Sequence, residues 1–417
     1  MEKFIAVAAW LVFVWYVLKF GILLYFGIAT PATTTLFYIT LCISAILFID
    51  VLSNRFKASI NPNFKVLIVT TCLTLFCGEY ALRYIFKKNL VYSEQLGAPY
   101  FSFYSYIYDW CDIKTYLFGQ TNYWYLKNEP NSMEKTGIGS RHWEHKYNSQ
   151  GFREGEKPPL ADDTAHLVIG LGDSFTEGTG THGDSTWLRF FERNMNAKSN
   201  CKVRTFNAGA KGSDVFFEYL VLEKLLEEYH PNTVVLCVNS SDIDDIIIKG
   251  GRDRFKPGGK LQFNSPPAWE RLYAVSFIFR AIMHSSHNLD WTMLTFKEKA
   301  QRGKEALDSI SFCIKQFDKL AKQKNFNLVV VFHPREQEII SGDFALDSLA
   351  EKLAADKSLR IVNLKTEFVR SGAITKQNSS AYYWKTDLHH NTEGYKAMGD
   401  AIARYVLSEK IMCAAEE

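Results

Sequence analysis

Apolar residues are distributed differently in the first 88 residues and in the rest of the chain. Three long apolar runs lie in the first part, at residues 4–28, 36–49 and 66–86. A helix that crosses a bilayer needs about 20 apolar residues, so we predict a transmembrane region of about three helices over residues 1–88. Glu79 and Arg83 interrupt the third run, at a spacing that would let them pair on one helix face.

Two further features bear on the membrane prediction. A cleaved signal peptide is the rival interpretation of the first run, but that run is too long and has no small-residue cleavage site. With three spans, the N-terminus and the loop between the second and third spans lie on one side of the membrane, and they contain Lys3, Arg55, Lys57 and Lys65. The other side has Arg83, Lys87 and Lys88 at the end of the third span. The positive-inside rule then favours a cytoplasmic N-terminus. We expect an integral protein of the inner or plasma membrane, in contact with the lipid bilayer and with an extracytoplasmic C-terminal domain.

The remainder of the chain has the pattern of a globular protein. Residues 89–150 are rich in Tyr, Trp and Asn without periodicity, which predicts an irregular connector. In residues 151–417, short apolar runs predict buried strands at 166–171, 203–206, 233–238, 327–332 and 359–362. Amphipathic helices are predicted between and after them, at 187–195, 215–228, 304–323, 346–355 and 394–411.

This alternation predicts an α/β fold. We expect a doubly wound, flavodoxin-like parallel sheet of about five strands, with ligands bound at the carboxyl ends of the strands. An insertion at about residues 245–296 interrupts the alternation with a Gly/Pro-rich loop and an apolar helix over residues 269–284. That helix either helps to cover the core or forms a lid or membrane-facing flap over the site.

Composition excludes some classes of function. The net charge of +3, without a basic stripe, does not indicate a partner nucleic acid. The eight cysteines form no CxxC pair, so we predict neither a metal site nor a disulfide framework. We also expect no cofactor.

The stretch "VIGLGDSFTEGTG", residues 168–180, contains a candidate nucleophile. An apolar strand stops at Gly172, which permits a sharp bend, and Ser174 then opens a helix or turn. A serine at that place can attack a carbonyl carbon while its own N–H faces the developing oxyanion. The alternative is an ordinary turn, since Gly-Asp-Ser is common in turns.

The segment "TDLHHNTEGYKAMGDAIA", from Thr386, contains the partners that such a serine requires. Asp387 could orient His389 on the loop before a helix, and the imidazole would then accept the serine proton. The alternative is a solvated loop in which Asn391 or Thr392 caps the helix.

These segments together resemble the SGNH/GDSL hydrolase superfamily of serine esterases and acyltransferases. The matching blocks, in the order of that family, are "GDSFTEG", "FNAGAKG", "PNTVVLCVNSSDI" and "DLHHNTEGY". The stretch "NSQGFREGEKP", from Asn148, is similar to the lead-in of a membrane-linked branch. The resemblance covers about residues 145–410.

The resemblance implies a triad of Ser174, His389 and Asp387. It also implies an oxyanion hole formed by the N–H groups of Ser174 and Gly209 together with a side chain of the third block. Where the family has Gly-x-Asn-Asp, this chain places Ser241 at the Asn position, with Asn239 as the alternative donor.

Three further residues are candidates for roles in the site. Many members of the family place the Asp three residues before the catalytic His, which would select His390, but the His-x-Asn-x-x-Gly-Tyr tail fits His389. His333, at the end of a predicted strand, and Trp384, beside Tyr383, are candidate substrate-binding residues.

The implied function is an esterase or O-acyltransferase that acts through an acyl-serine. Its substrates would be O-acyl esters, above all acetyl esters, of cell-envelope or secreted polysaccharides, and a membrane-bound acyltransferase is an implied partner. Two alternatives stay open: a non-catalytic scaffold that binds a glycan or a membrane partner, and a lipid-acting esterase.

Overall fold

The computed structural model describes residues 62–89, 131–138, 141–153, 165–249, 251–252, 276–287, 295–385 and 387–412. The first two predicted spans and most of the predicted connector lie outside these residues. The chain divides into two compact units, which we call the helical unit (Met1–Asp109 and Ser265–Ala300) and the sheet unit (Trp110–Asn264 and Gln301–Glu417).

The sheet unit contains the predicted five-stranded parallel sheet. Its strands are β3 (His166–Leu171), β4 (Val203–Asn207), β5 (Thr233–Asn239), β6 (Asn327–His333) and β7 (Arg360–Asn363). They lie in the order β4-β3-β5-β6-β7, which is the flavodoxin-like arrangement with its reversal of order between β3 and β5. The sequence prediction of the sheet is confirmed, because strands buried on both faces leave near-continuous apolar runs.

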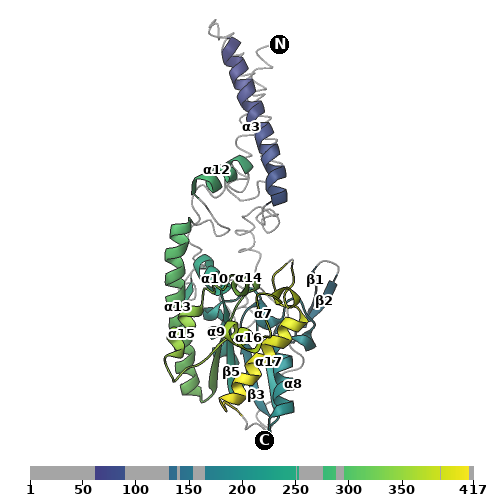
Figure 1. Cartoon of the computed structure of the whole chain (residues 1–417), viewed down its shortest axis with the longest axis vertical. Coiled ribbons are helices and arrows are strands. Elements are labelled where there is room, and N and C mark those ends of the chain that lie inside the picture. The colour runs from purple at the N-terminus through teal and green to yellow at the C-terminus, as the bar shows by residue number, and fades with distance from the viewer. Residues whose placement is uncertain are drawn as a thin grey trace. The chain divides into compact units, whose positions relative to one another are not determined.

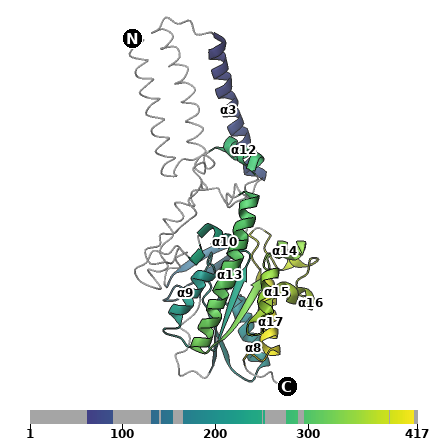
Figure 2. The ribbon, with the colours of Figure 1, turned by 90° about the vertical axis from the view of Figure 1, so that its left-hand side faces the viewer.

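Helices cover both faces of this sheet (Figure 1). One face carries α8 (Trp187–Lys198), α16 (Leu364–Ser371) and α17 (Thr392–Ser408), and the other α9 (Val215–Leu225), α13 (Phe296–Lys324) and α15 (Asp347–Ala354). The short elements are α7 (Ser174–Glu177), η1 (Gly183–Ser185), α10 (Ser241–Lys249), α14 (Glu336–Ser341) and η3 (Ser379–Ala381). Figure 2 shows α13 running along the strands beside α9.

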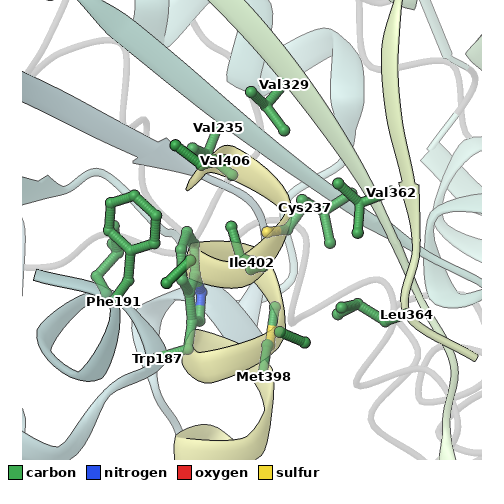
Figure 3. Packing of buried hydrophobic residues seen from close by; sticks show 14 of the residues in the cluster. Trp187, Phe191, Val235, Cys237, Val329, Val362, Leu364, Met398, Ile402 and Val406 are labelled. Atoms are coloured by element: carbon green, nitrogen blue, oxygen red, sulfur yellow. The ribbon is translucent and has the colours of Figure 1, made fainter. Parts of the chain in front are cut away.

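The core between the sheet and α8 and α17 is fully apolar at its centre (Figure 3). Trp187 of α8 and Met398 and Ile402 of α17 are completely buried there against Val235 of β5. Burial of each such side chain contributes about 1.5–3 kcal/mol, which fixes α17 and therefore the loop that precedes it.

A β-hairpin occupies part of the region predicted as an irregular connector. It consists of β1 (Met133–Ile138) and β2 (Arg141–Lys146), paired antiparallel. β2 buries Trp143 and His145 on one face. The hairpin was missed because its strands, MEKTGI and RHWEHK, contain few of the apolar residues from which a strand is predicted.

The helical unit joins α3 (Pro62–Asn89) to α12 (Phe277–His287). The carboxylate of Glu79, 1% exposed, accepts hydrogen bonds from the Ser276 hydroxyl at 3.0 Å and the Ile278 N–H at 3.1 Å, and also from the Phe277 N–H. A carboxylate at a helix N-terminus satisfies unpaired N–H groups and complements the helix dipole. The Arg83 side chain, which was predicted to pair with Glu79, lies outside the described residues.

The predicted apolar helix over residues 269–284 is described from Phe277 onwards, as part of α12, which packs on α3. Both interpretations of this helix, a cover for the core and a lid over the site, stay predictions.

Within the described part of the chain, no helix combines the length and the apolar character needed to cross a membrane. The third predicted span, residues 66–86, falls on α3.

The structure contains a disulfide bond, although the sequence analysis predicted no disulfide framework. Cys201 takes part in a disulfide bond, whereas Cys237 and Cys313 are buried free thiols. The sequence predicted no disulfide framework because its cysteines show no short spacing, and a pairing without a short spacing leaves no pattern to find.

Candidate active site

Ser174 is the first residue of α7, at the carboxyl end of β3. Gly172, at φ 150°, makes the bend between them, and a side chain there would meet the Thr176 hydroxyl at 2.2 Å. Asp173 caps α7 by accepting the Phe175 N–H at 2.9 Å. The N–H groups of a first helical turn have no acceptor within the helix, so the Ser174 N–H is available to an anion.

The structure brings Ser174, His389 and Asp387 together. The Ser174 Oγ lies 2.8 Å from the His389 Nε2, across 215 positions of sequence. The His389 Nδ1 lies 3.3 Å from the Asp387 Oδ2, close enough for charge attraction although the two atoms are not aligned as a hydrogen bond. Catalytic contacts are often loose before substrate binds.

The backbone between Asp387 and His389 explains how residues two apart can meet. Leu388 lies at φ 66°, in the left-handed region, and the Asp387 Oδ1 accepts the His389 N–H at 3.1 Å. A non-glycine residue in that region costs about 1–2 kcal/mol, and such strain is found preferentially at functional sites.

Three side-chain contacts connect the loop of His389 to the segment that follows α7. The Trp384 indole N–H donates to the Gly180 carbonyl at 2.9 Å, and the Tyr395 hydroxyl donates to the Thr179 carbonyl at 2.8 Å. The Thr181 and Thr392 hydroxyls lie 2.9 Å apart. These contacts hold the segment after Ser174 against the segment that contains His389, which positions the serine hydroxyl beside the imidazole.

His390, the alternative base, is placed elsewhere. Its side chain is completely buried, and its Nδ1 lies 3.1 Å from the Tyr382 carbonyl, which requires a proton on Nδ1. Its Nε2 lies 2.8 Å from the Nε2 of His333 and must accept that hydrogen bond. Burial, and then the neighbouring His389, lower the pKa of His390 to about 3.

His333 does not line an open site in this structure. It is 1% exposed, and burial and the adjacent His390 lower its pKa well below the ordinary value. The Phe175 ring contacts both His333 and His389, with centroids 4.5 and 4.8 Å away. The His333 imidazole is thus buried in the interior of this structure, and its expected role in substrate binding stays a prediction.

The predicted oxyanion donor Gly209 is also engaged elsewhere. Its N–H donates to the Asn207 Oδ1 at 3.0 Å. A side chain at Gly209 would lie 2.3 Å from the Glu177 N, so this glycine allows α7 to approach the loop after β4. The Gly209 N–H can therefore donate to an oxyanion only if its hydrogen bond to Asn207 breaks.

The two side chains of the third block lie next to the nucleophile turn. The Asn239 Nδ2 donates to the Asp173 Oδ2 at 2.8 Å, and the Ser241 Oγ lies 3.0 Å from the same oxygen. The single Ser241 hydroxyl proton is shared between that oxygen and the Asn239 Oδ1. An amide carries a second N–H, so Asn239 can donate to an oxyanion without releasing Asp173.

The aromatic side chains of Trp384 and Tyr383 already contact other residues of the protein. Trp384 is half-buried, and its ring contacts Trp143 with centroids 5.3 Å apart and the Arg141 guanidinium at 5.0 Å. Tyr383 is 2% exposed and donates to the Pro334 carbonyl at 3.0 Å. Tyr383 is thus a core residue, and the substrate-binding role of Trp384 stays a prediction.

A group of buried carboxyls lies behind the nucleophile turn. Glu218 and Asp242 are 1% exposed, and burial raises the pKa of each well above its ordinary value. The Glu218 Oε1 accepts the Ser213 hydroxyl at 2.7 Å. Among the residues that the structure describes, no cluster of His, Cys, Asp or Glu has the arrangement of a metal site.

Comparisons with known proteins give likenesses to solved structures. No family model matches the chain, and neither does any curated protein. The acetyl xylan esterase AlAXEase is 16% identical over 58% of this chain and 100% of its own, with a TM-score of 0.36. The acetylxylan esterase Axe2 from Geobacillus stearothermophilus is 13% identical over 58% and 94%, with a TM-score of 0.36. The lipase/acylhydrolase from Enterococcus faecalis is 13% identical over 58% and 95%, with a TM-score of 0.33. No activity, substrate or residue role follows for this chain from likenesses at these values.

Proposed function

We propose that the sheet unit is a serine esterase or O-acyltransferase that works through an acyl-serine intermediate. The observation that carries the proposal is the 2.8 Å contact of the Ser174 Oγ with the His389 Nε2, with Asp387 3.3 Å from the other imidazole nitrogen. A hydroxyl, an imidazole and a carboxylate in this order form the arrangement that activates a serine.

The steps follow from the positions of these atoms. His389 accepts the Ser174 proton as the Oγ attacks the ester carbonyl carbon, and Asp387 stabilises the resulting imidazolium. The Ser174 N–H and the Asn239 amide are the candidate donors to the oxyanion. His389 then donates its proton to the leaving alcohol as the ester C–O bond breaks. Water or a sugar hydroxyl, deprotonated by His389, attacks the acyl-serine, and His389 returns that proton to the Ser174 Oγ as the bond between the acyl carbon and the Oγ breaks.

We infer the substrate class from the sequence blocks. The resemblance of "NSQGFREGEKP" to the lead-in of a membrane-linked branch supports acetyl or other short O-acyl esters of cell-envelope or secreted glycans, with a membrane-bound acyltransferase as partner. Activity on long-chain esters exceeding that on acetyl esters would instead support the lipid-acting esterase.

We also propose that the sheet unit lies outside the cytoplasm, anchored by the apolar runs at 4–28 and 36–49. The disulfide at Cys201 supports this, because such bonds persist in oxidising compartments and are rare in the cytosol. Lys357 is exposed and offers the test. A Lys357→Cys protein on intact cells should react with a membrane-impermeant maleimide more than the wild type, which has an exposed free thiol at Cys77. Labelling only after permeabilisation would place the unit in the cytoplasm.

The nucleophile is tested with a fluorophosphonate probe and mass spectrometry. We expect one adduct on Ser174, and complete loss of adduct and of aryl acetate hydrolysis in Ser174→Ala. Ser185→Ala is the matched control, because Ser185 lies in η1 and its hydroxyl donates only to Asp184 among the described residues. Equal hydrolysis by the wild type and Ser174→Ala would refute the assignment.

The non-catalytic scaffold remains the second candidate, because the Gly209 N–H is bound to Asn207 and the third block lacks the usual Asn. A folded wild type that neither reacts with the probe nor hydrolyses the ester would favour it.

A further inference from the structure

The segment that carries the nucleophile has little stability of its own. α7 is a single turn of four residues, and Gly178 ends it at φ 90°. A helix this short is not stable in isolation, and its last carbonyl groups have no partners within it. Other parts of the protein must hold it in place.

Arg153, which follows the end of β2 at Lys146, supplies such contacts. Its guanidinium is buried and donates to the Glu177 carbonyl at 3.1 Å, to the Thr181 carbonyl at 2.5 Å, and to the Gly178 carbonyl. One side chain therefore binds three backbone carbonyls between residues 177 and 181. Burial lowers the pKa of Arg153, while the charge of Glu177 opposes that shift.

Glu177 connects the same turn to two other segments. Its carboxylate, completely buried, accepts the Tyr147 hydroxyl at 2.9 Å and the Lys211 N–H at 2.7 Å, and lies 3.3 Å from the His145 Nδ1. Burial alone would raise its pKa, but the hydrogen bond with His145 and nearby positive charges lower it overall. A carboxylate held in the charged form binds the hairpin side chains and the loop after β4 to α7.

We propose that Arg153 and Glu177 form a brace, and that Arg153 is a positioning residue for the reaction of Ser174. The inference rests on the proposed function. The brace holds residues 177–181 from the hairpin side, while Trp384 and Tyr395 hold residues 179 and 180 from the side of the histidine loop. The 2.8 Å contact between the serine and the imidazole depends on both sides.

The brace acts on the reaction step more than on substrate binding, because Arg153 is 4% exposed and contacts backbone carbonyls. Displacing a reacting group by about 1 Å can cost about 100-fold in rate. Loss of the guanidinium contacts should therefore lower kcat while KM changes little.

Arg153→Lys is the test variant. Lysine keeps the positive charge beside Glu177, but it lacks the planar fork that reaches three carbonyls. Arg193→Lys is the matched control, since Arg193 also donates to a backbone carbonyl, that of Asp184 at 2.9 Å, but is exposed. With an aryl acetate, we expect kcat of Arg153→Lys to fall by about 10-fold or more with KM within about 2-fold, and Arg193→Lys to match the wild type. A wild-type kcat in Arg153→Lys would overturn the proposal.

A second readout does not depend on catalysis. Amide hydrogen exchange in peptides covering residues 174–181 should be faster in Arg153→Lys than in the wild type, and unchanged in Arg193→Lys. If the wild type itself lacks esterase activity, the proposed function fails, and the exchange result alone decides whether the brace exists. Unchanged exchange would overturn the brace.

Tyr147→Phe covers the case in which Arg153→Lys does not fold. It removes one hydrogen bond to the Glu177 carboxylate without removing a charge. The brace predicts faster exchange in residues 174–181 and a lower kcat in this variant, and wild-type values of both would contradict it.

Discussion

At the scale of single residues, burial separates two adjacent histidines, of which the sequence selected His389 and left His390 as the alternative. His389 is partly exposed and faces Ser174, whereas His390 is buried and bonded to His333 and the Tyr382 carbonyl. An imidazole held neutral in the interior cannot accept a proton readily, because the charged form loses its hydration there. The geometry therefore supports His389 as the base.

Substitution of the two histidines should have unequal effects on activity. We expect His389→Ala to lower kcat/KM for an aryl acetate by about 1,000-fold or more, because the serine loses its base. His390→Asn should stay within about 10-fold of the wild type, with a lower Tm from the lost packing and hydrogen bonds. A larger kinetic loss in His390→Asn would identify His390 as the base.

The His390–His333 pair also predicts a dependence of stability on pH. The pKa of His390 is about 3 in the folded protein against an ordinary value of 6.5. At pH values above 6.5 the His390 imidazole is neutral in both the folded and the unfolded protein, so its full contribution to the free energy of unfolding is present there. As pH falls towards about 3, only the unfolded chain binds the proton, so stability falls by about 1.4 kcal/mol per pH unit for this histidine.

The measurement is the unfolding free energy in urea between pH 7 and pH 4.5. His390→Gln should show a shallower loss than the wild type over this interval, because glutamine does not titrate. Parallel curves for the two proteins would show that His390 titrates normally in the folded state.

At the scale of secondary-structure elements, the site forms where two neighbouring strands end. β3 and β5 are paired, so Asp173 after β3 meets Asn239 at the end of β5. The order of the sheet reverses between these strands, which leaves a crevice at their carboxyl ends. The turn of the nucleophile and the candidate oxyanion donors are brought together by strand order.

The two donors of the third block should not contribute equally. We expect Asn239→Ala to lower kcat by about 100-fold, as loss of one oxyanion donor does. Ser241→Ala should lower it by less than about 10-fold, because that hydroxyl is already shared between Asp173 and Asn239. Steady-state kinetics with an aryl acetate measures both, and the reverse ranking would assign the donor to Ser241.

At the scale of the whole molecule, the fold connects segments that are far apart in the chain. Packing of α17 on α8 and the sheet brings the loop before α17 to Ser174. Cys201 of the same unit takes part in a disulfide bond. A disulfide stabilises mainly by restricting the unfolded chain.

Removal of that disulfide should weaken the fold without changing the chemistry. Cys201→Ser is expected to lose about 2–4 kcal/mol of unfolding free energy, measured in urea, while kcat of the folded protein stays near the wild-type value. Reductant should then lower the Tm of the wild type but leave Cys201→Ser unaffected. An equal response of both proteins to reductant would contradict a stabilising disulfide at this position.

Sequence alone determined the parallel sheet and the candidate Ser, Asp and His residues, because buried strands and short polar motifs are local patterns. It did not reveal the hairpin, whose strands are polar, or the commitment of the Gly209 N–H to Asn207. Only the tertiary structure showed that His390 is buried against His333 and that Arg153 and Glu177 contact the segments around the nucleophile turn. The hydrogen-bond partner of a polar group depends on which distant segment lies against it, and no local pattern of residues encodes that.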